Sequence, residues 1–271
     1  MDNRPIGVFD SGLGGLTVVK ELKNILPDEQ IIYFGDTGRV PYGNRSRETI
    51  RRYTAQDIRL LQSFDVKMIV AACGTVSANV LEKEIEGLKV PYTGVLLPAV
   101  QSACAVSTNG VIGVIGTTAT VRSGAYGKAI RGIRPDAKVI GHDCPLFVPL
   151  VENGMVERGN RITELTVQMY LTPFLTEDID TLIMGCTHYP LLYGFISDIF
   201  GNHVTLIDPG KETAHYVQNY LTSSNMLFEG DDPQPNRYFV SDTVDGFCET
   251  AEKFLQRDLN GQVERIMIED Y

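Results

Sequence analysis

Short apolar runs alternate along the chain with longer segments in which apolar residues recur every three or four positions. The short runs predict buried strands at Ile6–Phe9, Ile31–Phe34, Lys67–Ala72, Tyr92–Leu96, Val111–Ile115, Lys138–Gly141, Thr181–Met184 and Val204–Ile207. The longer segments predict amphipathic helices, such as Thr17–Ile25, Arg47–Gln62, Ala78–Glu86, Arg161–Leu175 and Lys211–Leu221. This alternation is typical of α/β folds, in which ligands bind at the carboxyl ends of parallel strands. We therefore expect site residues directly after strands.

The chain also repeats itself weakly. The segment Ile6–Ser11 resembles Ile112–Thr117. In each half, an aspartate follows the next predicted strand and a cysteine follows a later one. These residues are Asp36 and Cys73 in the first half, and Asp143 and Cys186 in the second. Such ordered matches favour a duplication. If the strand ends of the two halves face each other, a cleft forms between them with one cysteine on each wall.

The last stretch, from Asp208 onward, matches neither half. It is interrupted at Pro233–Pro235, then predicts a strand at Arg237–Ser241 and a helix at Asp245–Leu255. We expect this stretch to complete the first domain, which would comprise residues 1–97 plus 208–271, with residues 98–207 forming the second. The predicted fold is α/β, with two similar domains, each a mostly parallel sheet flanked by helices, and the active site in the cleft between them.

Composition narrows the classes of partner. The 271 residues are 43% hydrophobic and carry a formal net charge of −10, which argues against nucleic acid or an anionic membrane as a partner. A small acidic substrate stays compatible, because helix N-termini and backbone donors can make a pocket locally positive. No apolar run reaches the roughly 18 residues of a membrane helix, and Met1–Pro5 lacks a signal-peptide layout. We expect a cytoplasmic protein.

The five cysteines are widely spaced and odd in number, which favours reduced thiols over a disulfide framework. The histidines show no metal-ligand spacing, so no metal is expected. A single buried cysteine is more often a packing residue than a functional one. Cys73 and Cys186 stand apart from such packing cysteines, because each of them follows an apolar run and precedes small or hydroxyl residues. A thiol placed there is expected to have a lowered pKa, through backbone N–H groups and the helix dipole.

The other three cysteines and two further polar residues give weaker indications of a functional site. Cys104 and Cys248 are expected to be packing residues, whereas Cys144 follows a strand end and stays open. His188, two residues after Cys186, could orient or deprotonate the thiol. Glu152 does not stand out by its spacing.

Three loops after predicted strands could bind a ligand. Asp10–Gly15 lacks the glycine spacing and the lysine of a phosphate loop, so it is either a plain turn or a turn that presents Asp10 and Ser11. Gly35–Gly43 is a set of turns or a source of backbone donors for a carboxylate. The hydroxyls of Gly116–Thr120 either cap a helix or hold an anion.

Four motifs in this order resemble those of the glutamate racemase family: Asp10-Ser11-Gly12-Leu13-Gly14-Gly15, Asp36-Thr37 with Arg39-Val40-Pro41-Tyr42-Gly43, Ala72-Cys73-Gly74-Thr75, and Gly185-Cys186-Thr187-His188-Tyr189-Pro190. The resemblance runs from residue 6 to about residue 255. It implies a racemase without a cofactor, built from two α/β domains, that interconverts L- and D-glutamate and supplies D-glutamate for peptidoglycan synthesis.

The resemblance also implies roles for individual residues. Cys73 would take the α-proton from D-glutamate and Cys186 from L-glutamate, assisted by Asp10, Glu152 and His188. The substrate site would be lined by Asp10, Ser11, Pro41, Tyr42, Gly43, Gly74, Thr75, Thr117, Thr120, Thr187 and His188. One departure stands out: the family commonly has Asn where this chain has Gly74, so an amide side chain is absent and only the backbone N–H remains.

Other functions stay open on the residues alone. The chain could racemise another amino acid such as aspartate, or act as a hydrolase or transferase through Cys186 and His188, or bind an amino acid without reacting with it. The expected partner is a small-molecule substrate, with neither nucleic acid nor membrane. A homodimer is implied only by the resemblance.

Overall fold

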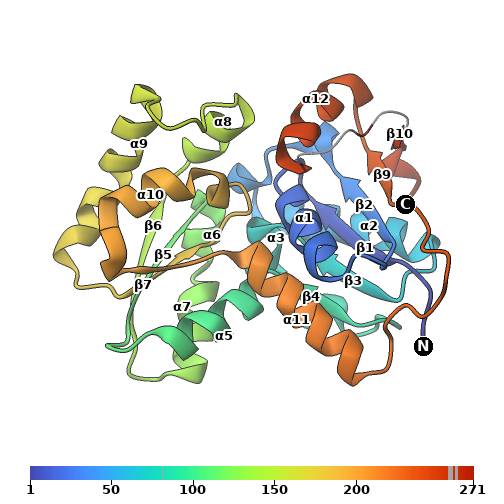
Figure 1. The fold of residues 1–271 in the computed structure, drawn as a ribbon, viewed down its shortest axis with the longest axis horizontal. Helices are drawn as coiled ribbons and strands as arrows, with labels where there is room; N and C mark the ends of the chain where they lie inside the picture. Colours follow the sequence, from blue (N-terminus) through green and yellow to red (C-terminus); the bar gives the residue numbers. More distant parts are fainter. Residues whose placement is uncertain (81, 256–258, 260–261) are drawn as a thin grey trace.

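The computed structural model describes residues 1–80, 82–255, 259 and 262–271. Its strands form two sheets that lie in two lobes side by side (Figure 1). Every strand pairing in these sheets is parallel. The strands are β1 (Ile6–Asp10), β2 (Ile31–Gly35), β3 (Met68–Ala71), β4 (Tyr92–Gly94), β5 (Val111–Gly116), β6 (Lys138–Asp143), β7 (Thr181–Met184), β8 (Thr205–Ile207), β9 (Arg237–Val240) and β10 (Val263–Arg265).

Helices cover the sheets. They are α1 (Leu16–Ile25), α2 (Arg47–Ser63), α3 (Gly74–Asn79), α4 (Glu82–Ile85), α5 (Leu96–Val106), α6 (Thr118–Ser123), α7 (Ala125–Ile133), α8 (Phe147–Glu152), α9 (Arg161–Leu171), α10 (Tyr193–Phe200), α11 (Pro209–Ser223) and α12 (Val244–Leu255). Short 3₁₀ helices lie between them at Thr37–Arg39, Tyr42–Asn44, Thr172–Thr176, Tyr189–Leu192, Gly201–His203 and Ile268–Asp270. None of the described helices combines the length and the apolar character needed to cross a bilayer.

The two sheets share one strand order. The first runs β10-β9-β2-β1-β3-β4 and the second β6-β5-β7-β8. The first four strands of the chain and the four strands from β5 to β8 therefore occupy matching positions, as the internal repeat predicts. The predicted fold class is confirmed. The late strand β9 pairs with β2, so the end of the chain returns to the first sheet. The proposed domain boundaries stay a prediction.

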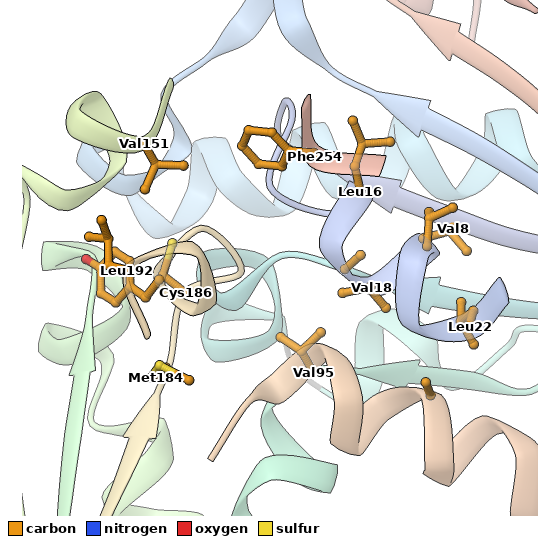
Figure 2. Packing of buried hydrophobic residues seen from close by; sticks show 14 of the residues in the cluster. Val8, Leu16, Val18, Leu22, Val95, Val151, Met184, Cys186, Leu192 and Phe254 are labelled. Carbon is orange, nitrogen blue, oxygen red and sulfur yellow. The ribbon is translucent and has the colours of Figure 1, made fainter. Parts of the chain in front are cut away.

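The apolar runs become strands because both faces of these parallel sheets are covered. Every residue of β1, β2, β3 and β7 is buried, which explains why the runs do not alternate with polar residues. One cluster of buried apolar side chains extends from the first lobe into the second. Figure 2 shows part of it, from Val8 and Leu22 near α1 to Val151, Leu192 and Cys186 on the other side, with Phe254 of α12 between Leu16 and Val151. The lobes thus share a continuous apolar contact.

Most predicted elements differ from the structure by one or two residues at an end, and three of the differences have a clear physical cause or change an element. The run Tyr92–Leu96 is a strand only to Gly94, since Leu96 begins α5 with Pro98 in its first turn, where the missing proline N–H is not needed. The segment Ala78–Glu86 is not one helix: α3 ends at Asn79 and α4 begins at Glu82, while Leu81 lies outside the described residues. The helix predicted at Arg161–Leu175 ends at Leu171, because Pro173 lacks the N–H that the next turn requires.

Candidate active site

The two sheets point the carboxyl ends of their strands at one cavity of about 250 Å³. Its walls come from segments that follow β1, β2 and β3 in the first half and β5, β6 and β7 in the second. The lining residues are Asp10, Ser11, Gly12, Leu13, Val40, Pro41, Tyr42, Gly43, Asn44, Cys73, Gly74, Thr75, Thr117, Thr118, Pro145, Val148, Pro149, Glu152, Cys186, Thr187 and His188. The cavity therefore contains both cysteines that the sequence paired, one from each half.

Cys73 lies at the N-cap position of α3 and is buried. Its Sγ lies 3.5 Å from the Ser11 hydroxyl. Burial, followed by the nearby charge of Asp10, raises the pKa of the Cys73 thiol to about 12, against the opposing hydrogen bonds from Ser11 and the Val76 N–H. The expectation of a lowered pKa is wrong for Cys73. The reason is that α3 has only six residues, so its terminal N–H groups do not compensate for the loss of water around the sulfur.

Asp10 is the partner of Cys73. The carboxylate accepts a hydrogen bond from the Gly12 N–H at 2.9 Å and contacts the Cys73 thiol. Burial raises the pKa of Asp10, while the charge of His188 and these hydrogen bonds oppose that rise. The loop Asp10–Gly15 is thus a tight turn that presents a carboxylate to the cavity.

Cys186 has a different partner. Its Sγ lies 3.7 Å from His188 Nδ1, and His188 Nε2 lies 3.0 Å from Glu152 Oε1 at the end of α8. Burial alone would lower the pKa of His188. Its hydrogen bonds to Cys186 and Glu152, together with the negative charges there, outweigh burial and raise that pKa to about 10. A cationic imidazole therefore lies beside Cys186 at neutral pH.

Two residues that are distant from His188 in the sequence, Gly14 and Phe254, lie against its imidazole ring. A Cβ on Gly14 would overlap the His188 ring, so only glycine lets the Asp10–Gly15 loop approach the loop after β7. The ring of Phe254, in α12, meets the His188 ring edge-on with centroids 5.9 Å apart. Sequence reasoning missed Phe254, because no local pattern shows that α12 packs against His188.

A buried network positions Tyr42. The Tyr42 hydroxyl contacts Asp36 and lies 3.2 Å from Asp57 Oδ2. Arg39 pairs with both carboxylates, at 2.6 Å to Asp36 and 3.0 Å to Asp57, and Ser241 donates to Asp36 at 2.8 Å. Burial, with the charge of Asp36 next, raises the pKa of Asp57 well above its ordinary value. The loop after β2 is therefore tied to α2 and to the end of β9.

Hydroxyl groups join the two halves across the cavity. Thr75 Oγ1 lies 2.9 Å from Thr117 Oγ1, which lies 3.0 Å from Thr120 Oγ1. Thr120 does not belong to the cavity lining and sits behind Thr117, so its substrate contact stays a prediction. Among the lining residues that the structure describes, none is Lys or Arg. A bound carboxylate would be held by neutral donors such as the threonines, Ser11 and backbone N–H groups.

All other predicted substrate-site residues line the cavity, and so do the three predicted catalytic assistants, Asp10, Glu152 and His188. The structure adds a group that sequence reasoning did not name: Gly12, Leu13, Val40, Asn44, Thr118, Pro145, Val148 and Pro149. Most adjoin a predicted residue, and Val148 lies about one helical turn before Glu152 on α8. These residues could have been found from their positions, either next to a predicted site residue in the chain or on the same helix face as one.

The remaining chemistry candidates lie elsewhere. Cys144 is buried in the apolar cluster that also contains Phe147 and Tyr189 and does not line the cavity, which answers the open question about it. Cys104 is buried in a third apolar cluster, as a packing residue would be. Within the described part of the chain, no group of histidine, cysteine, aspartate or glutamate residues could hold a metal ion.

Comparisons with known proteins show which family the chain resembles in sequence and in fold. The family model for Asp/Glu/hydantoin racemases matches residues 6–217. A glutamate racemase of Geobacter metallireducens is 44% identical over 98% of this chain and 97% of its own length, and one of Bacillus cereus is 42% identical over 98% of both. The crystal structure of glutamate racemase from Francisella tularensis in complex with D-glutamate superposes with a TM-score of 0.93, at 39% identity and full coverage of both chains.

Proposed function

The chain belongs to the Asp/Glu/hydantoin racemase family and is an amino-acid racemase, and we propose that it interconverts L- and D-glutamate with Cys73 and Cys186 as the two bases. One observation carries this proposal. The two thiols line a single cavity, and each comes from the strand end of a different half. Two bases on opposite walls suit racemisation, since a proton must leave Cα on one face and return on the other.

The proposed substrate rests on the relatives and on the cavity. Relatives that cover nearly the whole chain are glutamate racemases. The cavity, at about 250 Å³, lies just below the roughly 300–1,000 Å³ of drug-sized ligand sites, which suits a small amino acid. Its hydroxyl and amide donors, including Asn44 and the threonines, can hold carboxylates without a lysine or arginine side chain.

In the direction from L- to D-glutamate, the Cys186 thiolate removes the α-proton and the electron pair stays on Cα and the adjoining carboxylate. The Cys73 thiol then donates its own proton to the opposite face. The substrate thus loses one proton to Cys186 and gains one from Cys73. The raised pKa of Cys73 keeps that thiol protonated before substrate enters, and the cationic His188 beside Cys186 favours charge separation on that side.

The reverse direction uses the same groups with their protons exchanged. Cys73 must then lose its proton, and Asp10 is the carboxylate in contact with it. His188 and Glu152 play the corresponding part for Cys186. Because a carboxylate serves one thiol and an imidazole the other, we propose that the two walls assist mirror-image proton transfers by different means. Preorganised neutral donors would stabilise the carbanion-like state, which makes a cofactor unnecessary in this proposal.

Hydrogen exchange in heavy water tests the proposal. L- and D-glutamate and L- and D-aspartate are incubated with protein that has been dialysed against a metal chelator and freed of pyridoxal phosphate. We expect deuterium at Cα of both glutamate isomers together with their interconversion. Exchange confined to aspartate would move the substrate assignment, and activity that requires an added metal or pyridoxal phosphate would remove the cofactor-free scheme.

Cysteine variants test the two bases. Cys73→Ala and Cys186→Ala should each lose racemisation while circular dichroism shows an unchanged fold, with Cys104→Ala as the control for loss of a buried thiol. Full turnover by either single variant would overturn the two-base scheme. A hydrolase or transferase acting through Cys186 would instead tolerate Cys73→Ala and form a covalent adduct, visible as a mass increase.

We also propose that the protein acts in the cytoplasm and that the D-glutamate it forms is used for peptidoglycan synthesis. Support comes from the resemblance of the chain to glutamate racemases. Complementation of a bacterium that requires D-glutamate checks this: growth without added D-glutamate is expected from the unchanged chain and not from Cys73→Ala. A homodimer stays a prediction, to be checked by sedimentation.

A further inference from the structure

A buried threonine of α1 joins the first half of the molecule to the segment that carries Cys186. The hydroxyl of Thr17 lies 2.9 Å from the carbonyl oxygen of Thr187 and 2.8 Å from that of Gly14. Thr17 does not belong to the lining of the substrate cavity. We propose that Thr17 is a positioning residue, whose hydroxyl holds the segment from Cys186 to His188 against the first half.

The carbonyl oxygen of Thr187 uses this donor because of the residue three positions later. The carbonyl oxygens on either side of it, those of Cys186 and His188, accept from the N–H three residues further on, at 3.0 and 3.1 Å. Position 190 is a proline, which has no N–H to donate to Thr187. The Thr17 hydroxyl takes the place of that donor, from a residue 170 positions away in the chain.

The two acceptors of the Thr17 hydroxyl do not depend on it equally. A hydroxyl carries one hydrogen, so this hydrogen is shared between the two carbonyl oxygens or donated to one of them. The Gly14 oxygen also accepts from the Thr17 N–H at 3.1 Å, so it keeps a donor when the hydroxyl is removed. The Thr187 oxygen would lose the bond that joins it to α1. Loss of the hydroxyl should therefore act on the Cys186 wall of the cavity.

His188 is the group that this loss would displace. A Cβ on Gly14 would overlap the His188 ring and the Thr187 hydroxyl, so the two loops touch where the bond holds them. A buried carbonyl oxygen that has lost its donor is stabilised by moving toward water, which would draw the segment away from α1. The distances of 3.7 Å from His188 to Cys186 and 3.0 Å to Glu152 depend on the position of that segment. We expect both contacts to lengthen without the hydroxyl.

The test follows kcat in both directions, since this role rests on the proposed function of Cys186 as the base for L-glutamate. Thr17→Val removes the hydroxyl and keeps the shape of the side chain. We expect kcat from L- to D-glutamate to fall about tenfold or more, with a smaller fall from D to L. Thr17→Ser keeps the hydroxyl and should retain most of the rate. Thr213→Val is the matched control and should leave kcat unchanged, because the buried Thr213 hydroxyl donates to the Pro209 carbonyl oxygen at 2.6 Å, within α11.

A double-mutant cycle separates positioning from a general loss of stability. If Thr17 acts through His188, Thr17→Val should lower kcat little further in the His188→Gln background, so the two losses would not be independent. Independent losses would place the effect elsewhere and overturn the proposal. Unchanged kcat in Thr17→Val would do the same, and so would equal falls in both directions that Thr213→Val reproduces. Circular dichroism of each variant checks that the fold is retained.

A second measurement does not need racemase activity. Burial alone would lower the pKa of His188, but its contacts with Cys186 and Glu152 raise that pKa to about 10, and NMR of labelled imidazole in the full chain can follow it. We expect the pKa to fall by about half a unit or more in Thr17→Val and to stay in place in Thr17→Ser and Thr213→Val. This fall in a chain that does not racemise glutamate would refute the proposed function and support the positioning role. An unchanged pKa in folded Thr17→Val would overturn that role.

Discussion

Gly74 and Gly185 bring the two halves into backbone contact directly beside the two cysteines. A Cβ on residue 74 would overlap the carbonyl oxygen of Gly185. Since Gly74 follows Cys73 and Gly185 precedes Cys186, this contact limits how far apart the two thiols lie. The glutamate racemases that this chain resembles commonly have Asn at this position, so Gly74 lacks an amide side chain. In this structure the space for that amide is occupied by the opposite wall.

Gly74→Ala should therefore push the walls apart and misplace one thiol relative to the other. We expect kcat to fall about 10- to 100-fold, because a displacement near 1 Å at reacting atoms costs about that much. Steady-state racemisation measured by polarimetry checks the prediction. Gly132→Ala is the control, since its Cβ would have no neighbour within 4 Å. Unchanged kcat in Gly74→Ala would mean that the contact does not set the geometry of the site.

His188→Gln should affect the two directions unequally in kcat. His188 contacts Cys186, the proposed base for L-glutamate, whereas Cys73 has Ser11 and Asp10 as its partners. We expect a larger fall of kcat from L to D than from D to L, with a larger α-deuterium isotope effect for L-glutamate. The ratio kcat/KM must stay equal in both directions, because the two isomers have equal free energies. Equal falls of kcat would contradict a role confined to the Cys186 side.

Glu152→Gln should move the alkaline limb of the L-to-D rate to lower pH. Glu152 is one of the groups that raise the pKa of His188 to about 10. Without its charge that pKa falls, so the imidazolium is lost at lower pH, by about one pH unit or more. Profiles of kcat between about pH 7 and 11 measure the change. Glu157→Gln, which removes an exposed carboxylate further along the chain, should leave the limb in place.

Stability should fall as the pH rises, in part through His188. Its pKa in the folded protein, about 10, lies above the ordinary 6.5. The folded state therefore holds more protons than the unfolded state between these values, and this contribution is complete below about pH 6.5 and lost as the pH rises through 10. Urea unfolding of the wild type and of His188→Gln at several pH values checks this. The variant should show the shallower decline, and parallel declines would refute the assignment.

Asp57→Asn should destabilise the folded protein less than Asp57→Leu does. Burial raises the pKa of Asp57, and the amide introduced by Asp57→Asn could still accept from Arg39 and donate to the Tyr42 oxygen. Leucine removes one of the partners of Arg39 and one of the partners of Tyr42, while both keep Asp36, so we expect a loss of about 0.5–1.5 kcal/mol for each hydrogen bond removed. Urea unfolding should rank the wild type, Asp57→Asn and Asp57→Leu in that order. The KM should rise mainly in Asp57→Leu, because Tyr42 lines the substrate cavity.

Local patterns were sufficient to find most of the candidate site. Cys73 and Cys186 could be paired because each follows a buried strand, and parallel strands end at a common edge. His188 was visible through its neighbour Cys186. Thr120 lies behind Thr117, and local pattern could not show this, since a hydroxyl near a helix start can bond to the cap as easily as it can face a ligand. Phe254 and the carboxylate Asp57 were not found, because each reaches the site from a segment with no local sign of it.

Local sequence patterns establish the two α/β halves, their internal repeat and the position of each thiol at a strand end. Those properties depend on apolar periodicity and on short motifs, which the chain carries locally. The pKa values of the site groups depend instead on the tertiary structure. Burial beside Asp10 raises the pKa of Cys73, whereas Glu152 and Cys186 together raise that of His188. These effects depend on the loss of water and on distances between segments far apart in the chain, and neither quantity can be read from local pattern.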